Sequence, residues 1–74
     1  MNPWQDRHPS VAHFAPLFAY SHLPEHLQKI SAPFADLAVG LLGQVPDGPE
    51  LSVALRKLLE GKDCAVRAAL LADQ

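Results

Sequence analysis

The 74-residue chain contains a single cysteine, Cys64, so no disulfide can form within it. A chain this short is one domain at most. Its thin core usually needs further stabilisation by a disulfide, a bound metal or association with another subunit. A metal is a poor candidate, because no CxxC or HExxH pattern occurs and, of the histidines, only His22 and His26 have helical i, i+4 spacing, with Pro24 between them. We therefore expect no metal, no cofactor and a homo-oligomer.

The chain also lacks a basic run and a long apolar run, and we expect no signal peptide at its start. Its net charge is −2 and its six lysines and arginines are dispersed, which argues against binding to DNA or RNA backbones. Asp36 interrupts the best candidate for a membrane span. Residues 1–10 do not pair a basic region with an apolar one, as a signal peptide would. These absences predict a cytoplasmic protein that binds neither DNA nor membranes.

Catalytic patterns are missing too. The sequence has no paired carboxylates and no glycine-rich phosphate loop, and none of its serines has a GxSxG context. Cys64 lacks neighbours that would clearly make it a thiolate. We expect a binding protein rather than an enzyme.

What the chain does have is apolar surface, since apolar residues make up 49 % of it. Residues 1–23 form a segment rich in proline and aromatic residues, with Pro3, Pro9 and Pro16 and four of the five aromatic residues. Prolines at this density exclude a long helix, but a short one is predicted around 11–20. The aromatic rings must be buried against something, so this segment is not a free tail.

Residues 24–74 are predicted to form an antiparallel two-helix hairpin, which makes the fold all-α. The first helix spans about 24–43, with Pro24 in its first turn and an apolar face at helical spacing. Pro33 should kink or break it near Ser31, with the same face buried on both sides. The apolar face comprises Leu27, Ile30, Phe34, Leu37, Ala38 and Leu41.

A turn at 44–48, rich in proline and glycine, leads to a second helix over about 49–71. One arc of this helix is apolar, and the opposite side carries a charged stripe of Arg56, Glu60, Asp63 and Arg67. The apolar arc comprises Leu51, Ala54, Leu55, Leu58, Ala65, Val66 and Ala69, and its small residues allow another helix to approach closely.

Four residues invite a functional interpretation. Lys62 falls near the middle of the apolar arc, where it is either a lysine that snorkels or pairs with another subunit, or a fixed cation for an anionic ligand. Tyr20 and His22 precede the first helix. They either close the edge of the core or offer a stacking ring and a hydrogen bond. Arg67 is either a solvated stripe residue or a further cation for the ligand.

Several strings together resemble small proteins of actinobacterial phages and prophages, which are similar to the hairpin domain of phage sponge proteins that counter the CBASS and Thoeris defence systems. The strings are FAYSHLP (18–24), FADLA (34–38), PDGPE (46–50), ALRKLLE (54–60) and KDCAVR (62–67). The resemblance implies a homo-oligomer, with a hexamer expected, that sequesters cyclic di- or trinucleotides without cleaving them. It also implies a tyrosine that stacks on a base, matched here by Tyr20, and a phosphate-binding lysine on the first helix, where Lys29 is the only one.

The candidate ligand site therefore comprises Tyr20, His22, Lys29, Lys62 and Arg67, and either lysine is a candidate for the phosphate. The rival hypothesis is a small phage adaptor or regulator that binds another protein through its apolar face. An adaptor needs only an exposed apolar groove, whereas a sponge needs an aromatic plate and a cation.

Overall fold

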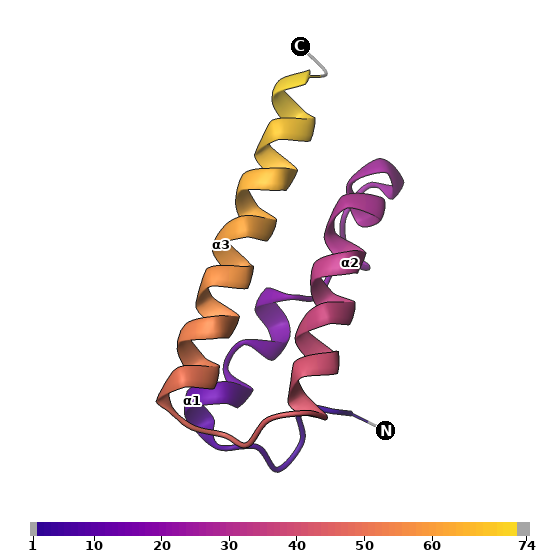
Figure 1. Ribbon diagram of the computed structural model, residues 1–74. Helices are drawn as coiled ribbons and strands as arrows, with labels where there is room; N and C mark the ends of the chain where they lie inside the picture. Colours follow the sequence, from indigo (N-terminus) through magenta and orange to yellow (C-terminus); the bar gives the residue numbers. More distant parts are fainter. Residues whose placement is uncertain (1, 73–74) are drawn as a thin grey trace.

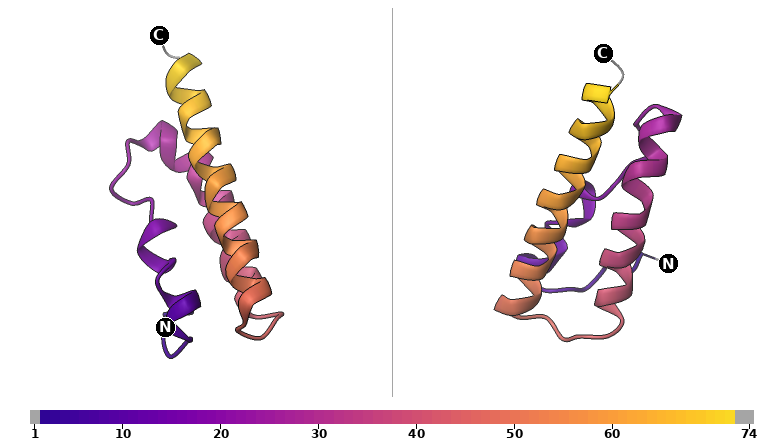
Figure 2. Two further views of the ribbon diagram at one scale, coloured as in Figure 1. Left: turned by 90° about the vertical axis from the view of Figure 1, so that its left-hand side faces the viewer. Right: turned by 45° about the horizontal axis from the view of Figure 1, so that its top comes forward.

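The computed structural model describes residues 2–72, and within them every regular element is helical. A short helix α1 (Pro9–Ala12) and a 3-10 turn η1 (Ala15–Leu17) precede two long helices, α2 (Glu25–Leu42) and α3 (Pro49–Ala72). The long helices run antiparallel and are joined by a short turn (Figure 1). The segment before α2, residues 2–24, lies along one face of this hairpin and forms a second layer, here called the N-terminal layer (Figure 2). The predicted all-α hairpin is confirmed.

Local signals explain where the long helices begin and end. Pro24 is the N-cap of α2 and Glu25 stands in its first turn, so the helix begins one residue later than predicted. Gly43 caps its carboxyl end. Pro49 and Glu50 occupy the first turn of α3, as predicted, because proline needs no helical hydrogen-bond acceptor there.

Helix α2 runs through Pro33 without a break. Of the two predicted alternatives near Ser31, a kink or a break, the break is wrong, because Ser31 lies inside the helix and is only 1 % exposed. Leu27 before it and Ala38 after it are both buried. Packing on both sides of Pro33 offsets the one backbone hydrogen bond that proline removes.

Half of the buried hydrophobic cluster comes from the N-terminal layer, in the form of Trp4, Val11, Phe14 and Phe18. The other half comes from Ala38 and Leu42 of α2 and from Leu51 and Leu55 of α3. The ring of Phe18 stacks on Trp4 with centroids 6.1 Å apart and meets Phe14 at 6.4 Å. The prediction that the N-terminal aromatic residues are buried is confirmed for these three, whereas Tyr20 is only half-buried. The layer and the hairpin share one core.

The predicted apolar faces are only partly covered. Leu37 of the first face is 54 % exposed, and Ala54 of the second is exposed as well. The charged side of α3 also differs in part from a solvated stripe. Arg56 lies over the ring of Phe14, 5.6 Å from its centroid, and so joins the helix to the N-terminal layer.

A polar clasp ties the N-terminal layer to the turn of the hairpin. Arg7 Nη2 lies 2.9 Å from Asp47 Oδ1, and the backbone N–H of His8 donates to Asp47 Oδ2 at 2.7 Å. Arg7 also donates to the carbonyl of Val45 at 3.4 Å. The side chains of Arg7 and Asp47 are 24 % and 25 % exposed, so water screens this pair less than an open surface pair.

The clasp predicts a stability effect for Asp47→Ala. The variant loses an ion pair and a charge-assisted hydrogen bond, so its free energy of unfolding should fall by about 1–2 kcal/mol in a urea titration. Glu60→Ala is the control, because Glu60 lies 3.8 Å from Lys57 and both side chains are more than half exposed. It should cost less than about 0.5 kcal/mol. Equal losses in the two variants would contradict the clasp.

Candidate functional site

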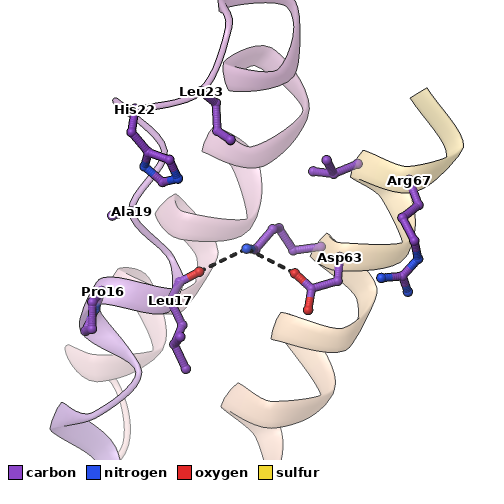
Figure 3. A pocket seen from close by; sticks show the side chains of 9 residues that line it. Pro16, Leu17, Ala19, His22, Leu23, Asp63 and Arg67 are labelled. Carbon is purple, nitrogen blue, oxygen red and sulfur yellow. Dashed lines mark hydrogen bonds and ion pairs between the residues drawn. The ribbon is translucent and has the colours of Figure 1, made fainter. Parts of the chain in front are cut away.

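A cleft of about 370 Å³ opens between the N-terminal layer and α3 (Figure 3). Its first wall is the end of η1 and the loop that leads to α2, and its second wall is the middle of α3. The residues that line it are Pro16, Leu17, Ala19, His22, Leu23, Lys62, Asp63, Val66 and Arg67. Three of the five predicted ligand residues thus meet in one place.

Lys62 spans this cleft. Its Nζ donates to the carbonyl oxygen of Leu17 at 2.9 Å and lies 3.1 Å from Asp63 Oδ1. The side chain is 13 % exposed, which agrees with its predicted place on the inner side of α3. Leu17 ends η1, so its carbonyl lacks a continuing helix partner and is available to the ammonium group. The cation is held by groups of its own chain.

His22 and Arg67 face the cleft differently. His22 projects from the loop before α2 toward the side of α3, and its residue is exposed (Figure 3). Arg67 lines the wall, but its guanidinium points away from the cleft, and Nη2 donates to Cys64 Sγ at 3.4 Å (Figure 3). The polar groups directed into the space are therefore the imidazole, the ammonium group and the carboxylate of Asp63.

The other two candidates lie outside the lining of the cleft. Tyr20 is half-buried in the loop between two lining residues, and its carbonyl accepts the N–H of Leu23 at 3.0 Å. Lys29 is exposed on α2. Tyr20 is next to a lining residue in the sequence, but its ring is not part of the wall of the cleft.

Sequence reasoning missed two groups of the cleft. Asp63 was assigned to the charged stripe, yet it is the carboxylate beside Lys62. The signal that could have indicated this pairing is the position of Asp63 directly after the lysine. The Leu17 carbonyl had no signal, because backbone acceptors become available only through the path of the chain.

The one serine–histidine contact in the described hydrogen bonds is a helix cap. His8 Nδ1 accepts the backbone N–H of Ser10 at 3.1 Å and lies 2.8 Å from its Oγ, at the start of α1. Asp47 bonds the backbone of His8 rather than its ring. The third group that orients the base in a nucleophilic triad is thus engaged elsewhere.

Residues 2–72 lack the features of two other classes of site. No three side chains of the metal-binding types gather there into a group that could hold an ion. In the same range, no helix combines the length and the apolar character needed to cross a membrane. The sequence and the structure match no protein-family model, no curated protein and no solved structure.

The Lys62 contact predicts a measurable contribution to stability. Lys62→Met keeps most of the apolar stem but loses the hydrogen bond that joins α3 to the N-terminal layer. The free energy of unfolding should fall by about 0.5–1.5 kcal/mol in a denaturant titration. Lys57→Met is the matched control, because Lys57 is 72 % exposed on the same helix. If both variants unfold alike, Lys62 does not hold the layer.

Proposed function

We propose that this chain is a non-catalytic sponge that binds cyclic di- or trinucleotide signals and thereby counters a bacterial anti-phage defence, acting as a homo-oligomer in the host cytoplasm. The observation that carries the proposal is the positioned ammonium group of Lys62 in an open cleft beside an imidazole. The resemblance of the five sequence strings to phage sponge proteins adds to it.

The size of the cleft supports a small ligand or one part of a larger one. Pockets for small molecules occupy roughly 300–1,000 Å³, and this cleft of about 370 Å³ is near the lower limit. It can accept one nucleotide unit, with the remainder of a cyclic ring outside. Its wall residues Leu17, Leu23 and Val66 offer apolar contact to a sugar or base.

The electrostatics favour an anion that displaces a carboxylate. An ammonium group has three donors, and here one of them bonds the Leu17 carbonyl while Asp63 takes up a second. A phosphate oxygen can replace Asp63, which is 46 % exposed and free to turn into water. Lys62 keeps its bond to Leu17 throughout, so it meets the phosphate without reorganising.

Tyr20 and Lys29 have the roles that the resemblance implies, base stacking and a second phosphate contact. Tyr20 stands between the lining residues Ala19 and His22 in the chain, so its backbone lies at the edge of the cleft. Stacking of a base on an aromatic ring contributes about 1–3 kcal/mol. Lys29 is farther along α2, and the substitutions below separate it from Lys62.

Calorimetric titration with a panel of cyclic di- and trinucleotides tests the site. Lys62→Met should weaken binding by about 10–100-fold, because a hydrogen bond to a charged group contributes roughly 1.5–3 kcal/mol. Asp63→Asn should strengthen it by about three- to fivefold, since it removes a competing charge worth roughly 0.7–1 kcal/mol. Structural roles alone do not predict an increase.

Lys57→Met serves as the control for charge, with Tyr20→Ala and Lys29→Met measured beside it. Each titration is run well below the melting temperature of the variant, so that lost affinity is not lost folding. Unchanged affinity in Lys62→Met, Tyr20→Ala and Lys29→Met would overturn the proposed site. Binding by none of the panel would overturn the proposed ligand class.

A sponge must also release its ligand unchanged. The protein is incubated with the best-bound cyclic nucleotide, denatured and analysed by chromatography. The cyclic form should be recovered in full, because the cleft holds a cation and an imidazole but no activated nucleophile. Linear products that increase with protein concentration would contradict the non-catalytic proposal.

Exposed apolar residues on the long helices favour one second candidate, a protein-interaction module. Leu37 and Val39 of α2 and Val53 of α3 are 39–54 % exposed. An adaptor would bind its partner through such a face and would not respond to cyclic nucleotides. The calorimetric panel therefore separates the two functions.

A further inference from the structure

A second hollow, of about 380 Å³, lies at the turn of the hairpin, away from the cleft of Lys62. Side chains from the end of α2, the turn and the start of α3 form a mostly apolar groove, namely Leu41, Val45, Pro46, Leu51 and Ala54. Two acids, Asp47 and Glu50, also line it. Arg7 and the His8 N–H already engage Asp47, so Glu50 supplies the negative charge of the groove.

The opposite end of the molecule presents the complementary features. Helix α3 has 24 residues and α2 has 18, so at about 1.5 Å per residue α3 is roughly 9 Å longer. Its last turns extend past α2 (Figure 1). There Leu70 and Leu71 are 44 % and 67 % exposed. Arg67 precedes them by three and four positions, so it shares their side of the helix.

We propose that the occupant of the groove is a second copy of this chain. Leu70 and Leu71 of one copy enter the groove of the next, and Arg67 pairs with Glu50 there. The guanidinium already points away from the Lys62 cleft, toward Cys64. Apolar surface thus meets apolar surface. Arg67, the cation next to the leucines, meets Glu50, the acid of the groove that takes no part in the clasp.

The two surfaces lie at opposite ends of the hairpin, so the contact is heterologous. Each copy offers one donor end and one acceptor end, and such contacts close into a ring or continue as a filament. A contact made by two leucines and one arginine is smaller than a standard stable interface, which buries about 1,600 Å². Closure of a ring strengthens the assembly, because each copy then makes two contacts.

A mixing experiment tests this head-to-tail arrangement. Leu71→Asp disables the donor end, and Ala54→Arg fills the groove. Both positions are exposed, so both variants should fold as the wild type does, which circular dichroism checks. In sedimentation velocity the wild type should form particles of several chains, and each variant alone should be monomeric. An equimolar mixture should form a one-to-one dimer and nothing larger.

Val53→Asp is the matched control, because Val53 is 50 % exposed on the same helix but does not line the groove. It should assemble as the wild type does. Glu50→Arg and Arg67→Glu should each weaken assembly, and the double variant should regain at least tenfold in the assembly constant over either one.

Three outcomes would overturn the proposal: a monomeric wild type at about 100 µM, unaltered assembly in Leu71→Asp or Ala54→Arg, or a mixture that stays monomeric. The proposal does not rest on the sponge function. Leu71→Asp leaves the Lys62 cleft intact, so ligand titration of this variant reports on the cleft while sedimentation reports on the contact.

Discussion

Burial of the N-terminal aromatic residues against the hairpin is the constraint on which the rest of this structure depends. Two helices joined by a turn meet along one line and leave most of their apolar faces open, so they supply little core. Phe14 and Phe18 fill the space beside that line, and Phe14 is only 1 % exposed. With half of the buried cluster contributed by the first 18 residues, the hairpin and the layer depend on each other.

The same docking creates the candidate site. The layer is held at the turn by the contacts of Arg7 with Asp47, and farther along α3 by Lys62 on the carbonyl of Leu17. Between the second contact and the start of α2 the chain does not pack tightly on α3, and the cleft lies there. Lys62 can therefore have a structural and a functional role at once, because the hydrogen bond that fixes the layer also positions the ammonium group in the cleft.

The sequence predicted the parts of the fold that have local signals. Pro24, Gly43 and Pro49 mark the ends of the long helices, and helical spacing placed Lys62 on the inner side of α3. Helix α2 nevertheless continues through Pro33, because the burial of Leu27 before it and of Ala38 after it outweighs the local preference of proline. A propensity argument does not contain that packing.

The site was less accessible to sequence reasoning than the fold. Residues 1–23 have no periodicity, so nothing in them indicated that the Leu17 carbonyl would face Lys62 or that the ring of Tyr20 would lie outside the cleft. Arg67 was a candidate by charge, but its rotamer turns it toward Cys64. Helical spacing gives the face of a residue and not the direction of its charged end.

The most direct test of the central claim, that the cleft between the layer and α3 binds the ligand, is a titration of the ¹⁵N-labelled protein with a cyclic dinucleotide, followed by amide chemical shifts. The largest changes should occur at Leu17, His22, Lys62 and Asp63, with little change at residues 45–50 of the turn. Changes confined to the turn or to the exposed side of α2, or no changes at millimolar ligand, would contradict this claim.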